Sequence, residues 1–202
     1  MLGRLDGAWR GAVTGALTAG LGFGGAKLAG RWLPNCFPAG TLVSTASGLQ
    51  PIETIEASEW VWAFDLLTGS WHLCRVLETY RQEGSVELVA LTAAGETTEA
   101  TAHHPYWVVA GEELEGRPQP EHIPDVPANA AVPGRWVDAI DLRVGDVLLL
   151  RSGERVPVTG LAVRQSTQAV YNFYVEGLHC YAVGKSAILS PNGFSGFLCN
   201  LS

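Results

Sequence analysis

The 202 residues provide enough chain for one sizeable domain, or for a domain of about 150 residues with a tail. Hydrophobic residues make up 47% of the chain and charged residues 16%, a balance that supports a packed core and excludes a disordered chain. The formal net charge of -7 leaves no basic surface to neutralise phosphates, so nucleic acid is not an expected partner.

Residues 1–35 form a leader rich in Gly and Ala. Its apolar run spans residues 11–30, but the charge-free part ends at Lys27, which is short for a membrane span. Two arginines precede this run, as in a signal peptide, yet Asp6 lies between them and no clean cleavage site follows. We therefore expect a flexible or loosely helical connector to something upstream, without stable membrane insertion.

The composition changes at residues 31–36, RWLPNC, where we place a domain boundary. From there to Asn192 the apolar segments are short, rich in Val, Thr, Trp and Tyr, and separated by Gly, Asp and Pro. They are TLVST, EWVWAFD, LCRVLETYRQ, VELVALTA, PYWVVA, DVLLL, VPVTGLAV, YNFYVEG, HCYAVG and SAILS. This pattern predicts an all-β domain of many short strands over residues 36–192.

Residues 111–135 interrupt the strand pattern with five prolines, several acidic residues and no apolar periodicity. They predict a long exposed loop insertion. The flanking halves, 36–110 and 136–192, have similar strand content, which fits a pseudo-twofold β fold. Residues 193–202 are interpreted as the start of a downstream segment.

Cys36 is the first candidate for chemistry, because it follows the turn signal Pro34-Asn35 and begins the predicted domain. A thiol in this position can attack the carbonyl of the preceding residue and replace an amide with a more reactive thioester. The step needs assistance, since amides are poor electrophiles and a free thiol is only slightly ionised near neutral pH.

The candidate assistants are Thr101 and His104, which stand three residues apart in the run TAHHPYWV. The same run has a purely structural interpretation, in which Thr101 makes a side-chain turn and Pro105 ends strand pairing. Both interpretations stay open on this run alone.

At the other end of the predicted domain, His179 precedes the dipeptide Asn192-Gly193. An asparagine side-chain amide can attack its own backbone carbonyl and expel the next residue as a succinimide forms, and glycine obstructs this attack least. Asn-Gly is also a common turn sequence, which is the alternative.

Metal and disulfide chemistry are not indicated. The cysteines at 36, 74, 180 and 199 show no CxxC spacing, and Cys74 and Cys180 fit small apolar core positions. His103 and His104 are adjacent, so in an extended segment they point to opposite faces and do not share one ion with His72 and Cys74. No cofactor is expected.

Taken in order, these residues resemble the motifs of the Hedgehog/intein (HINT) family. CFPAGTLVSTASGLQPIETIEASEWVWAFD is similar to its opening block, TAHHPYWV to its TxxH block, and VYNFYVEGLHCYAVGKSAILSPNG to its closing blocks. GRWVDAIDLRVGDVLLL resembles a segment of bacterial intein-like and pretoxin HINT domains. The resemblance implies a horseshoe of β strands with adjacent termini and self-cleavage without a cofactor.

The resemblance also implies a role for each candidate. Cys36 is the nucleophile, Thr101 and His104 bind and distort the Asn35-Cys36 amide, with His104 protonating the departing nitrogen, and Asn192 cyclises with His179 nearby. The expected partners are then the flanking segments of the chain's own polypeptide. This polypeptide is expected to be a bacterial toxin that is secreted or displayed on the cell surface, and the domain is expected to act as a monomer.

Two departures from the family pattern alter the expected outcome. Pro191 stands where cleaving HINT domains usually carry His, and it has neither an ionisable side chain nor an N–H. Gly193 stands where splicing inteins carry Cys, Ser or Thr. We therefore expect cleavage rather than splicing, and the alternative is an impaired HINT fold that serves as a structural spacer.

Overall fold

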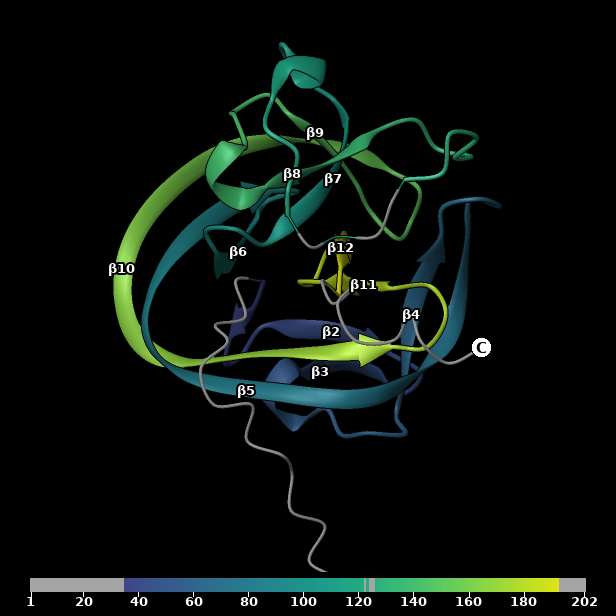
Figure 1. Ribbon diagram of the computed structural model, residues 1–202, viewed down its shortest axis with the longest axis vertical. Coiled ribbons are helices and arrows are strands. Elements are labelled where there is room, and N and C mark those ends of the chain that lie inside the picture. Colours follow the sequence, from purple (N-terminus) through teal and green to yellow (C-terminus); the bar gives the residue numbers. More distant parts are fainter. Residues whose placement is uncertain (1–34, 122, 124–125, 193–202) are drawn as a thin grey trace, which may run out of the picture. The chain divides into compact units, whose positions relative to one another are not determined.

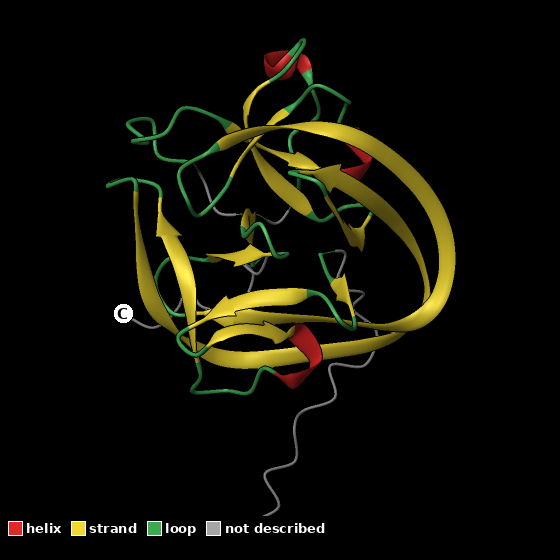
Figure 2. Cartoon of the chain, turned by 180° about the vertical axis from the view of Figure 1, so that it is seen from behind, coloured by secondary structure: helices red, strands yellow, loops and turns green. Residues whose placement is uncertain are grey.

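The computed structural model describes residues 35–121, 123 and 126–192. This part is nearly all-β, as Figure 1 and Figure 2 show, which confirms the predicted fold class. Apart from Asn35, the predicted leader lies outside the described residues, and so does the segment 193–202. In the described ranges, no helix has the length and apolarity needed to span a bilayer.

The strands and the short 3-10 turns follow one another along the chain. The elements of the first half are β1 Phe37–Pro38, β2 Leu42–Thr45, β3 Gly48–Pro51, η1 Ile52–Thr54, β4 Trp60–Asp65, β5 Ser70–Ala93, β6 Glu96–Thr101 and β7 Pro105–Ala110. Those of the second half are η2 Leu114–Gly116, β8 Arg135–Asp138, η3 Ala139–Asp141, β9 Val147–Leu149, β10 Arg155–Val175, β11 Cys180–Val183 and β12 Ile188–Pro191.

Hydrogen bonds join these strands in the order β12-β11-β2-β4-β5-β10-β9-β7-β8, with β1 on β10, β3 on β2 and β6 on β5. The pairs are antiparallel. Segments from opposite ends of the sequence are thus neighbours: β1 begins the described domain and pairs with β10, while β11 near its end pairs with β2.

The prediction of short strands throughout was wrong for β5 and β10, which each join two predicted strands into one. They pair antiparallel from Val158 opposite Ala93 to Val175 opposite Val76 and curve side by side (Figure 1). The middle of this ribbon is polar and largely exposed around Arg164 to Thr167, so it resembled a loop in the sequence. Each strand satisfies the backbone groups of the other, and these hydrogen bonds do not need a buried face.

The core is filled by large side chains from both halves of the chain. Trp107 on β7 stands opposite Trp136 on β8, and their rings meet edge to face with centroids 4.9 Å apart. Phe37, which directly follows Cys36, is fully buried against the rings of Tyr106 and Tyr181. This packing fixes β1, and with it the backbone just before it, inside the domain.

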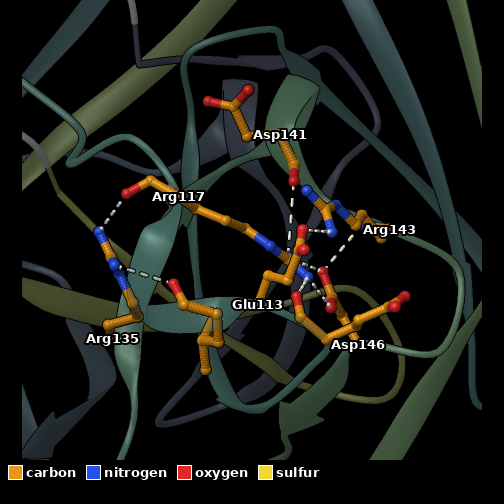
Figure 3. Close-up of polar contacts among 8 residues, drawn as sticks. Glu113, Arg117, Arg135, Asp141, Arg143 and Asp146 are labelled. Atoms are coloured by element: carbon orange, nitrogen blue, oxygen red, sulfur yellow. Dashed lines mark hydrogen bonds and ion pairs between the residues drawn. The ribbon is translucent and has the colours of Figure 1, made fainter.

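The segment between β7 and β8, predicted as an exposed loop, contains η2 and a buried anchor (Figure 3). The Arg117 guanidinium forms a two-pronged ion pair with the buried Asp146 carboxylate and also donates to the Glu112 carbonyl at 2.7 Å. Asp146 accepts a further bond from the Arg143 amide at 2.8 Å. The arginine therefore ties this segment to the turn before β9.

Candidate functional site

Cys36 lies at the start of β1 and is 1% exposed. It packs against Val86 and Leu88 of β5 and Val170 of β10. Burial raises the pKa of its thiol to about 12, because an ionised sulfur would lose its hydration there. At neutral pH the resting side chain is therefore a thiol rather than a thiolate.

Thr101, the last residue of β6, holds the backbone of Cys36 at both of its polar groups. The Cys36 amide donates to Thr101 Oγ1 at 2.9 Å. The Thr101 hydroxyl donates to the Cys36 carbonyl at 3.1 Å, and the Thr101 amide donates to the same carbonyl at 2.9 Å. The nitrogen of the Asn35-Cys36 bond is thus fixed by a side chain 65 residues away.

The carbonyl of the same bond has a partner that sequence reasoning missed. Asn35 O accepts a hydrogen bond from Asn172 Nδ2 on β10, and both residues are buried. The other end of the Asn172 amide, Oδ1, accepts from the Tyr181 hydroxyl at 2.9 Å and from the Phe173 amide at 2.8 Å. A polar residue at a buried position of the aromatic strand VYNFYVE was the available signal.

The turn between β6 and β7 directs His104 inward, because the His104 amide donates to the Thr101 carbonyl at 2.9 Å and closes the turn. The imidazole is fully buried and lies over the Phe37 ring, with centroids 4.0 Å apart. Burial lowers the pKa of His104 to about 3, while the backbone carbonyls of Asn35 and Pro191 oppose this shift. His104 is therefore neutral at physiological pH.

Ser190 on β12 determines which ring nitrogen of His104 carries the proton. Its Oγ lies 2.6 Å from His104 Nε2 and donates to the Pro105 carbonyl at 3.0 Å. Since the hydroxyl has a single proton to give, Nε2 is assigned as the N–H donor. Nδ1 then keeps its lone pair, and this atom has no hydrogen-bond partner among the described residues.

His103, the neighbour of His104, points away from this cluster. Its side chain is 65% exposed, and its Nδ1 lies 3.2 Å from Asp138 Oδ2. Burial raises the pKa of Asp138 to about 6, an effect that His103 partly offsets. The structure thus brings Cys36, Thr101 and His104 together and leaves His103 outside.

The predicted downstream residues form a second group. Asn192 is 1% exposed, and its backbone amide donates to the His179 carbonyl at 2.9 Å. In the orientation that satisfies both ends of its side-chain amide, Nδ2 donates to the same carbonyl at 2.6 Å and Oδ1 accepts from the Val175 amide at 2.5 Å. His179 therefore contacts Asn192 through its backbone.

The imidazole of His179 stacks on Tyr174, with ring centroids 5.2 Å apart. Partial burial lowers its pKa. Gly193, the other half of the downstream junction, lies outside the described residues. The two groups meet at β12, where Ser190 contacts His104 two residues before Asn192.

The remaining candidates show no metal-site geometry. The part of the chain that the structure describes contains no group of three His, Cys, Asp or Glu side chains able to hold a metal ion. Cys74 is half-buried, and the buried Cys180 thiol donates to the Phe64 carbonyl at 2.9 Å.

Comparisons with known proteins agree with this architecture. A family model described as the pretoxin HINT domain matches residues 127–193. The solution structure of a bacterial intein-like domain from Clostridium thermocellum is 34% identical with a TM-score of 0.63, and the match covers 78% of this chain and 99% of that one.

Two inteins share the fold at lower identity. The Ssp DnaB mini-intein variant M86 is 16% identical, has a TM-score of 0.60 and is matched over 82% of this chain and 99% of its own. A DnaB intein from Synechocystis sp. is 17% identical with a TM-score of 0.57 and coverages of 78% and 97%. A search of curated proteins gave no match. On the strength of the intein-like domain, which it matches at 34% identity over nearly that domain's whole length, this chain belongs to the HINT (Hedgehog/intein) family, close to its bacterial intein-like and pretoxin members.

Proposed function

We propose that this domain cleaves its own polypeptide at the Asn35-Cys36 bond, with Cys36 as the nucleophile. Membership of the HINT family supports autoprocessing in general. The observation that carries the specific assignment is the Thr101 contact, in which the amide nitrogen of this bond is held by Thr101 Oγ1 at 2.9 Å beside the buried thiol.

The first step forms a thioester. Cys36 Sγ attacks the Asn35 carbonyl carbon while the thiol proton passes to a base, and His104, neutral and with a free lone pair on Nδ1, fits that role. The C–N bond then breaks, and the nitrogen of Cys36 leaves as an amine with the proton returned by the imidazolium. Acyl and proton have exchanged places between sulfur and nitrogen, so no co-reactant is consumed.

Water or an external thiol next cleaves the thioester, which frees residues 1–35 and restores the Cys36 thiol. A slower cyclisation of Asn192 releases the segment that begins at Gly193. Gly193 has no side-chain nucleophile to receive the upstream acyl group, so the products are separate fragments rather than a spliced chain.

In its natural setting the proposed reaction releases part of a toxin polypeptide. The pretoxin HINT match over residues 127–193 supports this placement. The domain acts as a monomer on its own flanking segments, without metal or cofactor, and its polypeptide is bacterial and secreted or displayed on the cell surface.

The test is the intact mass of the full chain before and after incubation with a thiol. Wild type should yield the fragment 1–35, as acid or thioester, and a fragment that begins at Cys36. Cys36→Ala should fold and remain intact at this bond, with Cys74→Ala as a matched control that still cleaves. Cleavage at Asn35-Cys36 in folded Cys36→Ala contradicts the proposal.

The alternative function is a structural spacer without activity. Pro191 at the end of β12 favours it, because this residue has no group to assist the downstream cut. If the wild-type chain keeps its full mass after long incubation with thiol, the domain is a structural spacer and the proposed cleavage is wrong.

A further inference from the structure

We propose that Asn172 is a further catalytic residue, the donor that stabilises the negative charge formed on the Asn35 carbonyl oxygen during thioester formation, and that Tyr181 positions it. This inference rests on the proposed cleavage at Asn35-Cys36 and deepens it. The observation behind it is the direct contact between Asn172 Nδ2 and the oxygen of the bond to be broken.

The chemistry requires a donor at this oxygen. When Cys36 Sγ bonds to the Asn35 carbonyl carbon, the electron pair of the C=O double bond moves onto oxygen and creates an oxyanion. The carbonyl lies inside the protein, with Asn35 2% exposed, so water is poorly placed to solvate this charge. A fixed N–H donor in such an environment stabilises the intermediate more than the neutral amide.

The orientation of the Asn172 amide is set by its other contacts. Both neighbours of Oδ1 are donors: the Tyr181 hydroxyl at 2.9 Å and the Phe173 backbone amide at 2.8 Å. A rotated amide would turn an N–H group toward the Phe173 N–H and its oxygen toward the Asn35 carbonyl, and it would lose both of these bonds because the first group only donates and the second only accepts. Nδ2 therefore faces the Asn35 oxygen before the reaction begins.

The surroundings keep this arrangement rigid. Asn172 is 5% exposed, and Tyr181 is fully buried between Phe37 and Phe173, whose ring centroids lie 6.2 and 4.2 Å from its own. Burial raises the pKa of Tyr181, so its hydroxyl keeps the proton that it donates to Asn172. The pairing of Phe37 with Tyr171 places the Cys36 end of β1 beside this part of β10.

Asn172 and Thr101 thus bind opposite ends of the Asn35-Cys36 amide. Thr101 accepts from the nitrogen side, and Asn172 donates to the oxygen side. Of these two contacts, the one to oxygen strengthens as negative charge develops in the transition state, which is the property that accelerates a reaction.

The experiment measures the rate at which the full chain releases fragment 1–35 in thiol, by intact mass. Asn172→Ala and Asn172→Asp should each slow release about 100- to 1000-fold at neutral pH, the usual loss for one oxyanion donor. Gln165→Ala, an exposed change on the same strand, should cleave at the wild-type rate. Thermal unfolding of each variant checks that the fold is retained.

The pH profile separates catalysis from mere structural support. A buried aspartate has a raised pKa and becomes a donor when protonated, so Asn172→Asp should regain activity as the pH falls toward 5, whereas Asn172→Ala should not. Tyr181→Phe should slow release about tenfold in the wild-type background and have no further effect in Asn172→Ala, because it acts through Asn172.

The outcomes are distinct. If wild type releases fragment 1–35 and a folded Asn172→Ala or Asn172→Asp does so within threefold of its rate at neutral pH, Asn172 is not the donor and the proposed cleavage stands. If wild type never releases the fragment, the proposed function itself fails.

Discussion

At the scale of single residues, the nucleophile and the base of the proposed reaction begin as a neutral pair. The pKa of Cys36 is raised to about 12 and that of His104 is lowered to about 3, both mainly by burial. A charged thiolate-imidazolium pair is therefore unfavourable before attack, and proton transfer must accompany formation of the carbon-sulfur bond. In the proposed reaction, self-cleavage is thereby restrained until the carbonyl oxygen can accept negative charge, and the proposed hydrogen bond from Asn172 stabilises that charge.

From the lowered pKa of His104 we predict how the free energy of unfolding depends on pH. The ordinary pKa of 6.5 applies in the unfolded chain, and the folded value is about 3, so between these values the unfolded state binds more protons. Stability from the neutral imidazole is complete above pH 6.5 and is lost as pH falls toward 3. The free energy of unfolding of His104→Gln should therefore decrease less than that of its parent as the pH falls from 6.5 to 3.

The measurement is guanidinium chloride unfolding at several pH values, in the Cys36→Ala background so that the chain stays intact. An identical acid dependence in His104→Gln and its parent contradicts the assignment of a buried neutral imidazole.

The two adjacent histidines, His103 and His104, give a prediction about cleavage. His104→Ala should slow release of fragment 1–35 by about a hundred- to ten-thousandfold, the usual range for a lost acid-base group, and Thr101→Ala should have a smaller effect. His103→Ala should cleave nearly as wild type, since His103 faces outward toward Asp138. If His103→Ala loses more cleavage rate than His104→Ala, the acid-base role belongs to His103 and not to His104.

At the scale of elements, the segment between β7 and β8 depends on one arginine. Arg117 neutralises the buried Asp146, and its removal leaves that carboxylate without its counter-ion. Arg117→Ala should therefore lower the free energy of unfolding by about 3–5 kcal/mol, as expected when one partner of a buried pair is lost. Denaturant titration of the Cys36→Ala chain measures this change.

Arg143→Ala is the matched control for the arginine prediction. Its guanidinium pairs with Glu113 at 3.1 Å, and both side chains are substantially exposed. Such surface pairs contribute about 1 kcal/mol or less. Equal losses in Arg117→Ala and Arg143→Ala contradict a special role for the buried pair.

At the scale of the whole molecule, the sequence predicted the all-β fold and the cluster of Cys36, Thr101 and His104, because these residues sit in recognisable local runs. It missed Asn172, Tyr181 and Ser190, whose contacts depend on β1 pairing with β10 and on β12 packing beside β7. The length of β5 and β10 escaped prediction for a related reason. The polar middle of each strand is stabilised by pairing with a strand distant in sequence. The sequence of this part therefore shows no alternation of apolar and polar residues that would predict a strand.

The two junctions of the domain differ in how ready they are to react, which predicts that the downstream cut is the slower one. The Asn192 side chain is held by His179 O and Val175 N, so it must break both bonds before it attacks its own carbonyl. The His179 ring stacks on Tyr174, and Pro191 offers no proton to the leaving amine. General acid-base help of about a hundredfold corresponds to roughly 2.7 kcal/mol of barrier, so the step should be slow rather than absent.

Pro191→His should therefore accelerate release of the segment beginning at Gly193, Asn192→Ala should block it, and both should leave the Asn35-Cys36 cut unchanged. Intact masses of the three proteins over a time course measure both cuts at once. A wild-type chain that cleaves first after Asn192, or a Pro191→His chain with no gain there, contradicts the missing proton donor as the cause.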